Sequence, residues 1–523
     1  MKKKIGTFII LLVFACYVFI LAISISPTKS LEQIPNYTTQ KPTILFIVDS
    51  LMSEPLDKLV EQGAVPAFEF LIKNGKYEKN IVSSYPTMSV TIDSSILTGE
   101  YASEHKIPGL IWFNDEENRI IGYGSGISEI MNNGVKNVLL DSVVRLNGTH
   151  LSKEVQTIHE ELADLNIPSA SINGLVYRGK FPQTLTVPKF LSLTRLLPEK
   201  IEVKGPTLLS LGVLSEYNSL NNKQKYVWKR MGMNNIFTIN ELNMLLNQKK
   251  LPPFTLAYLP DADASIHKHG PNDVKGIKKA DIALQYFLNT FPSWEEALNE
   301  VNFIVIGDSG QSLINKDKNT SLIDLNELLN KYTVWDNGEA DAQLALAVNE
   351  RMAYIYLTDP TVNVLEVIEQ LQQDERVAFI AWKDGQANYC LSPKSEEKLI
   401  FSPEGKYKDI YDQSWNIKGN TSILDLHVSN DKNINYEQYP DALARLHGAL
   451  NTSVGELIIV DAMPSYEFIE QHSHNHAGGG AHGSLHKIDS IVPLIVTGTE
   501  KLPEYNRLVD IKAWIIQLMK ENM

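Results

Sequence analysis

The chain has 523 residues, 43% of them hydrophobic and 21% charged, with 24 Pro and 30 Gly. This is a globular composition, and it excludes disordered, collagen-like and coiled-coil classes. The formal net charge is -14, so we expect no binding to the nucleic-acid backbone, which needs a positive face. The only two cysteines are Cys16 and Cys390, which excludes a disulfide-stapled scaffold and a cysteine-rich zinc module.

The N-terminus predicts a membrane anchor. Residues 1–4 (Met-Lys-Lys-Lys) form a short basic tail, and no charged residue occurs in 5–26. At 1.5 Å per residue this run can cross a hydrocarbon core of about 30 Å. The lysines favour a cytoplasmic N-terminus and an exported remainder. We therefore expect a single-pass protein of the cell membrane whose helix contacts the lipid bilayer, with a cleaved signal peptide as the alternative.

Residues 27–41 are polar with two prolines and predict a tether. The following residues, 42–523, predict one domain in which apolar runs alternate with helical stripes. Such alternation predicts an α/β fold with a mainly parallel central sheet flanked by helices. The predicted strands are 43–48, 254–259, 302–307, 456–460 and 492–496, and the stripes run over 277–291 and 508–518. The long segments at about 110–250 and 325–450 are expected to be a lid and a cap inserted into this domain.

Acidic residues follow three of the predicted strands. Asp49 and Asp308 come directly after two of them, and Asp263 lies just past a third. Ligands of open α/β sheets bind beyond the carboxyl ends of the strands. The sequence therefore predicts that these carboxylates lie at one edge of the sheet and hold a ligand there.

Hydroxyl and imidazole groups complete the pattern. Ser89 lies in the segment 85–99, where a short helix is predicted to begin and its N-terminus would suit a phosphoryl oxygen. His267 follows Asp263 by four residues, and His482 precedes a glycine in a His- and Gly-rich stretch. Taken singly, each residue is explained by helix capping or surface hydrogen bonding. Together they are the donor set that two divalent cations need.

The order of these motifs resembles the alkaline phosphatase superfamily, and most of all its type I phosphodiesterase/nucleotide pyrophosphatase branch, over residues 41–500. The order is Asp, Pro-Thr-x-Ser, Thr-Gly, Asp-x-x-x-His, Asp-x-Gly and His-Gly. The resemblance implies a phosphoric ester hydrolase with Ser89 as nucleophile and Thr87 and Thr91 as fallback candidates. It also implies two ions, one held by Asp263, His267 and His482, the other by Asp49, Asp308 and the Ser89 oxygen.

Two positions depart from the family pattern. Ser309 stands where the family has a ligating His, so one site is rich in oxygen; zinc is expected, with Mn²⁺ as the alternative at the site of Asp49 and Asp308. A water, Ser309 itself or a histidine of 472–476 could fill the gap. Leu110 stands where nucleotide-cleaving members carry Asn, which leaves nucleotide specificity open.

The expected function is therefore a membrane-anchored, extracytoplasmic, metal-dependent phosphodiesterase or phosphatase acting on a phosphate-ester substrate. One alternative is a transferase of phosphoethanolamine or phosphoglycerol units to envelope polymers. The other is a degenerate surface protein that binds a metal or a phosphoryl group without turnover, which the substitution at Ser309 suggests.

Overall fold

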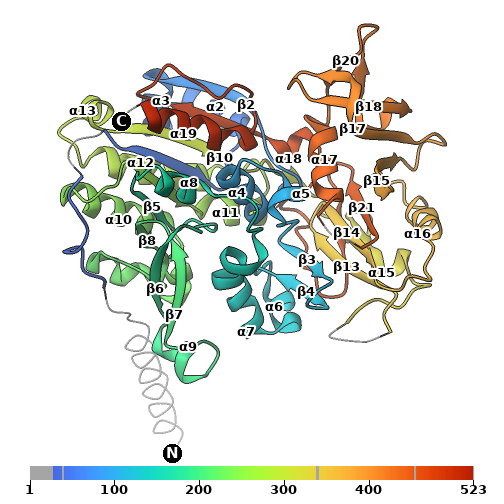
Figure 1. Ribbon diagram of the computed structural model, residues 1–523, viewed down its shortest axis with the longest axis horizontal. Helices are drawn as coiled ribbons and strands as arrows, with labels where there is room; N and C mark the ends of the chain where they lie inside the picture. The colour runs from blue at the N-terminus through green and yellow to red at the C-terminus, as the bar shows by residue number, and fades with distance from the viewer. Residues whose placement is uncertain (1–27, 38–40, 337–340, 453–454, 522–523) are drawn as a thin grey trace, which may run out of the picture.

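The structure, a computed structural model, describes residues 28–37, 41–336, 341–452 and 455–521. Within them, the central sheet has seven strands in the order β2–β24–β10–β1–β9–β5–β8 (Figure 1). Strand β24 is antiparallel to both its neighbours, and the pairs from β10 to β8 are all parallel. The predicted α/β fold with a mainly parallel sheet is thus confirmed. The strands are β1 (Thr43–Val48), β2 (Lys76–Val82), β5 (Ser169–Ile172), β8 (Leu208–Ser210), β9 (Phe254–Leu259), β10 (Asn302–Gly307) and β24 (Ile491–Val496).

Helices cover both faces of this sheet, because the apolar side chains of each strand alternate between the faces. In β1, Phe46 contacts Phe287 and Phe303 on one face, while Leu45 and Ile47 belong to the cluster on the other. The first face is covered by α2 (Ser53–Glu61), α3 (Pro66–Lys73), α10 (Asn235–Asn247), α12 (Lys275–Leu288) and α13 (Trp294–Glu300). The second is covered by α4 (Ser89–Thr98), α8 (Ile158–Asp164) and α19 (Ile511–Glu521). The two predicted helical stripes lie in α12 and α19.

A second, largely antiparallel sheet of nine strands stands beside the first and forms the right-hand part of Figure 1. Helices α16 (Val364–Leu371) and α17 (Ala442–Leu450) cover its two faces. Its strands are β13 (Leu344–Asn349), β14 (Met352–Leu357), β15 (Val377–Asp384), β16 (Ala387–Leu391), β17 (Leu399–Asp409), β18 (Ser414–Gly419), β19 (Leu426–Val428), β20 (Asn433–Tyr436) and β21 (Leu457–Ala462). We call this sheet with its two helices the cap.

One predicted strand belongs to the other sheet. The apolar run 456–460 forms β21, which pairs antiparallel with β14 and β15 in the cap and not with the parallel strands. A continuous apolar run indicates burial on both faces and does not specify which sheet supplies the neighbours.

The segment 110–250, expected as a lid, also departs from its prediction, because β5, β8, α8 and α10 lie within it and build the central domain. Short strands escaped the sequence pattern since they have only three or four residues. The rest of this segment comprises β3 (Ile111–Asn114), β4 (Arg119–Gly122), α6 (Ile127–Asn133), α7 (Val135–Leu140), the π-helix η1 (Asp141–His150), β6 (Phe181–Thr186), α9 (Lys189–Leu193), β7 (Lys200–Gly205), η2 (Gly212–Leu214), η3 (Ser219–Gln224) and η4 (Val227–Gly232).

The remaining short elements lie outside these two sheets. They are α5 (Ala102–His105), α11 (Asp261–His269), β11 (Ser312–Leu313), α14 (Lys318–Ser321), β12 (Leu322–Asp324), α15 (Leu325–Leu328), η5 (Thr421–Leu424), β22 (Glu467–Ile469), β23 (Gly480–Ala481), α18 (Lys487–Ser490) and η6 (Leu508–Asp510). The predicted anchor at 5–26 lies outside the described residues. Of the helices that are described, none has the length and apolar character needed to span a bilayer.

Candidate active site

The carboxyl ends of three neighbouring strands bring the predicted acidic residues to one edge of the central sheet. Val48 of β1 pairs with Gly307 of β10 and with Leu259 of β9, so the residues that follow these three positions start side by side. Asp49 and Asp308 follow directly. Asp263 lies in the first turn of α11, which begins two residues after β9 ends. The structure thus brings these three carboxylates to the same edge of the sheet.

The first group consists of Asp263, His267 and His482, whose ligand atoms all lie within 4.8 Å of one another. Asp263 Oδ1 is 3.0 Å from His267 Nε2 and 3.8 Å from His482 Nε2. His267 Nδ1 donates to the Gly480 carbonyl at 2.8 Å, and His482 Nδ1 donates to the carbonyl of Thr87. These bonds place the free lone pair of both imidazoles on Nε2, as a metal ligand requires.

The carboxylates around His267 favour a positive charge in this group. Burial lowers the pKa of His267, but the nearby carboxylates Asp263 and Glu350 raise it to about 10. The carboxylates therefore favour positive charge where the imidazole nitrogens and carboxylate oxygens converge. A divalent cation would supply that charge and satisfy the same atoms, so these residues fit a metal ion.

The second group consists of Asp49 and Asp308. Asp49 Oδ2 accepts a hydrogen bond from Tyr258 at 2.8 Å, and Asp308 Oδ1 accepts from the amides of Ser50 and Ser309, both at 2.7 Å. The other oxygen of each carboxylate is buried without a hydrogen-bond partner. Burial, together with the charge of Asp263, raises the pKa of both acids. Buried carboxylate oxygens of this kind are costly unless a cation satisfies them, so this pair also fits a metal ion.

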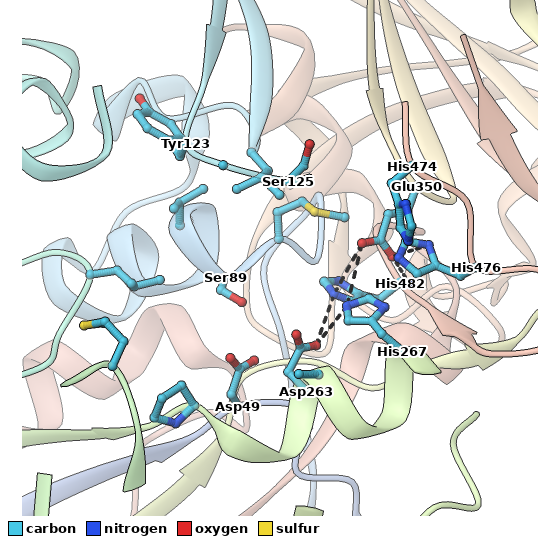
Figure 2. A pocket seen from close by; sticks show the side chains of 18 of the residues that line it. Asp49, Ser89, Tyr123, Ser125, Asp263, His267, Glu350, His474, His476 and His482 are labelled. Atoms are coloured by element: carbon cyan, nitrogen blue, oxygen red, sulfur yellow. Dashed lines mark hydrogen bonds and ion pairs between the residues drawn. The ribbon is translucent and has the colours of Figure 1, made fainter. Parts of the chain in front are cut away.

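Ser89 is the first residue of α4 and lines a cavity of about 750 Å³ together with the first group and Asp49 (Figure 2). The fallback candidates are buried away from it. Thr87 Oγ1 accepts from the Gly483 amide at 2.6 Å, and Thr91 is fully buried. The amides of Thr91 and Ile92 both donate to the Met88 carbonyl, which leaves the two preceding helix amides outside the intrahelical bonding.

Ser309, which stands in place of the family histidine, is fully buried, and its Oγ lies 3.3 Å from Ser50 Oγ. Of the histidines at 472–476, His476 lies beside His267, with 4.5 Å between ring centroids. Figure 2 shows it across His267 and His482 from Asp49. His476 thus accompanies the first group, and the position next to Asp308 is occupied by a serine.

Three site residues were missed by the sequence reasoning. Ser50 Oγ donates to Asp263 Oδ1 at 2.9 Å, and Gln311 Nε2 donates to both of these atoms at 2.8 Å. Ser50 directly follows Asp49, and Gln311 follows Asp308 by three residues. This closeness in the chain to predicted ligands was the only sign of their role. Glu350, from the cap, faces the imidazoles of the first group, and no motif marks it.

Apolar and basic side chains also line the cavity. The wall includes Leu110, Leu146, Leu175 and Met233, and Tyr123 and Ser125, labelled in Figure 2, also line the cavity. Arg230 and Lys268 also line the cavity. Such a cavity suits an anion with an apolar organic substituent.

The fold and the site are typical of a class of hydrolases in which an α/β sheet carries acidic and histidine metal ligands at its strand ends. Residues 43–485 match the family model described as type I phosphodiesterase / nucleotide pyrophosphatase. The chain belongs to this family, within the alkaline phosphatase superfamily, and is a phosphoric ester hydrolase. No curated protein sequence matches the chain significantly.

Solved structures share its fold at low sequence identity. Murine ectonucleotide pyrophosphatase/phosphodiesterase 5 is 14% identical, with a TM-score of 0.55, covering 92% of this chain and 95% of its own. The human protein of the same name is 15% identical at the same TM-score and coverage. Phosphonoacetate hydrolase from Sinorhizobium meliloti 1021, solved with phosphonoformate, is 14% identical, with a TM-score of 0.55, covering 94% of this chain and 100% of its own.

Proposed function

We propose that this protein is a metal-dependent phosphodiesterase or phosphatase in which Ser89 is the nucleophile. The observation that carries the proposal is the convergence on one cavity of the Asp263, His267 and His482 group, Asp49 and the Ser89 hydroxyl. Asp308 follows the strand next to that of Asp49, and each of these two carboxylates has a buried oxygen without a hydrogen-bond partner. Zinc is the expected ion in both sites, with Mn²⁺ as the alternative next to Ser309, where the ligands are oxygens.

The reaction proceeds in two displacements. Bound at these ligands, the divalent cations would lower the pKa of the Ser89 hydroxyl and neutralise the phosphoryl oxygens. The Ser89 oxygen loses its proton and forms a bond to phosphorus as the bond to the leaving alcohol breaks, and the alcohol takes up a proton. Water then attacks phosphorus, and the serine oxygen leaves and is reprotonated. The N-terminus of α4 favours the negative charge that develops next to Ser89.

The substrate class follows from the cavity. Murine ectonucleotide pyrophosphatase/phosphodiesterase 5 has been solved with AMP, so a nucleotide ester is one candidate for this chain. Leu110 and the neighbouring apolar wall favour a less polar ester over a nucleotide. The uncharged run at 5–26 supports attachment to the cell membrane with this cavity on the extracytoplasmic side.

The test is turnover of a chromogenic bis-ester, bis(p-nitrophenyl) phosphate, by protein loaded with Zn²⁺ or Mn²⁺. We expect turnover that a chelator abolishes and that added metal restores. His267→Asn should remove it, whereas His269→Asn, an exposed histidine on the same helix, should leave it unchanged. Equal turnover in chelator would contradict the metal dependence.

A further inference from the structure

Glu350 is a cap residue that the fold directs into the central domain. It lies in the two-residue turn between β13 and β14, where Asn349 pairs with Met352. Its φ of 59° is in the left-handed region, which is unfavourable for a non-glycine residue. Two backbone bonds hold the turn: the Glu350 carbonyl accepts from Phe468 at 2.8 Å, and the Arg351 amide donates to the His482 carbonyl at 2.9 Å.

The carboxylate of Glu350 faces the first group. Oε1 lies 3.8 Å from His267 Nε2 and 4.0 Å from His482 Nε2, while Oε2 accepts from the His482 amide at 2.9 Å. Across the described part of the chain, its ion-pair partners are histidines only; the neighbouring Arg351 is bonded to Asp489. One oxygen is thus anchored and the other is directed at the imidazole nitrogens.

The same nitrogens face Asp263, and in Figure 2 the two imidazoles lie between the carboxylates of Asp263 and Glu350. A second grouping, His267 with Glu350 and His476, is also close enough for an ion. Both groupings need the one free nitrogen of His267, so they exclude each other. The one that contains His482 also contains Asp263, whose Oδ1 lies 3.0 Å from that nitrogen, against 3.8 Å for Glu350 Oε1.

We propose that Glu350 is a fourth protein ligand of the ion held by Asp263, His267 and His482, so that one divalent cation joins the cap to the central domain. This inference rests on the proposed function. Two nitrogens and two carboxylate oxygens are ligands that zinc accepts, and expansion to five ligands would leave one position for a phosphoryl oxygen. Glu350 also brings the carboxylates of the site to four, with Asp49, Asp263 and Asp308, which matches the charge of two divalent cations.

The experiment measures zinc binding to the full chain, by metal analysis for stoichiometry and by competition with a chromogenic chelator for affinity. We expect two ions per wild-type chain and a roughly 10–100-fold weaker affinity for one of them in Glu350→Gln. Glu369→Gln makes the same change at an exposed position of the cap and should bind as the wild type does. His476→Asn should also keep both ions.

Three results would overturn the inference. The first is wild-type affinity in Glu350→Gln; the second is loss of an ion in His476→Asn while Glu350→Gln retains both. The third, a wild-type chain that binds no ion, would overturn the proposed function as well. If Glu350→Gln does not fold, hydrogen exchange on the wild type decides: zinc should slow exchange in residues 344–357, and unchanged exchange there would refute the ligand role.

Discussion

Ser89 differs from the other hydroxyl residues of its segment in where its side chain lies. It is half-buried and lines the cavity, whereas Thr87 and Thr91 are fully buried. Thr87 accepts a backbone hydrogen bond, and the Thr91 hydroxyl has no partner. These surroundings support Ser89 as the proposed nucleophile and give the other two hydroxyls no access to a substrate.

Replacing Ser89 with Ala should therefore abolish turnover, by a factor of about 10³ or more, with little change in the melting temperature. Removal of a nucleophile affects the chemical step, and the small change at a half-buried surface leaves the packing intact. Thr91→Val is the matched control, since it removes a neighbouring hydroxyl without changing its volume. Full activity in Ser89→Ala, or its loss in Thr91→Val, would contradict the assignment.

At the scale of single residues, the sequence predicts those candidate metal ligands that directly follow a recognisable strand or helix pattern. Asp49, Asp263 and Asp308 were predictable because apolar runs mark the strands that carry them. Glu350 was not, because its approach depends on how the cap lies against the central domain, a contact between segments that no local pattern encodes. Ser50 and Gln311 were also missed, because their hydrogen bonds to Asp263 join residues that are far apart in the sequence.

Helix α11 carries both Asp263 and His267, and its position is fixed by a glycine. A Cβ on Gly276 of α12 would lie 2.4 Å from Ala262 Cα and 2.8 Å from its carbonyl oxygen, so α11 and α12 would have to separate. The apolar periodicity of the sequence predicts the strand before α11 and the helix α12. It does not predict how closely α11 and α12 approach each other.

Gly276→Ala should lower the free energy of unfolding by about 1–3 kcal/mol and weaken metal binding, because the shift moves the residue that precedes Asp263. Thermal unfolding with and without zinc measures both effects. Gly148→Ala is the control, since a Cβ there would contact nothing within 4 Å. Equal stability and affinity in Gly276→Ala would show that α11 is positioned by other contacts.

Helix α10 contributes a buried acid that makes stability depend on pH. Glu241 accepts hydrogen bonds from the amides of Tyr217 and Asn218 and from the side chains of Asn221 and Ser210. Burial outweighs these donors and raises its pKa from 4.5 to about 7. The folded state therefore binds this proton more tightly than the unfolded state does.

The contribution of Glu241 to stability is full below about pH 4.5 and is lost as the pH rises to about 7, a change on the order of 3 kcal/mol. Glu241→Gln has no proton to lose, so its free energy of unfolding should fall less than that of the wild type over this range. Urea unfolding at several pH values measures the difference between the two proteins. Parallel curves would mean that the folded state does not hold the carboxyl protonated.

At the scale of the whole molecule, the cavity is built from residues between 49 and 482, and the predicted anchor lies far outside it in the chain. The sequence placed the central sheet and predicted a cap as an inserted segment. It did not reveal that the cap is itself a sheet with a helix on each face, because antiparallel strands and their partners are set by long-range pairing.

Deleting residues 1–26 should move the protein from the membrane fraction to the soluble fraction and leave kcat/KM unchanged. In the proposed arrangement the apolar run is the attachment, and the described residues that line the cavity all lie between 49 and 482. Cell fractionation and bis-ester turnover measure the two properties. A full-length chain found in the soluble fraction would contradict the anchor.

The central claim is that separate segments of the chain assemble a metal-dependent site around the Ser89 oxygen. Its most direct test is mass spectrometry of the protein after rapid acid quench during turnover of the bis-ester. We predict a phosphoryl adduct on the peptide that contains Ser89, present in metal-loaded protein and absent after chelation. Turnover with the adduct on another residue, or an adduct that forms equally in chelator, would contradict it.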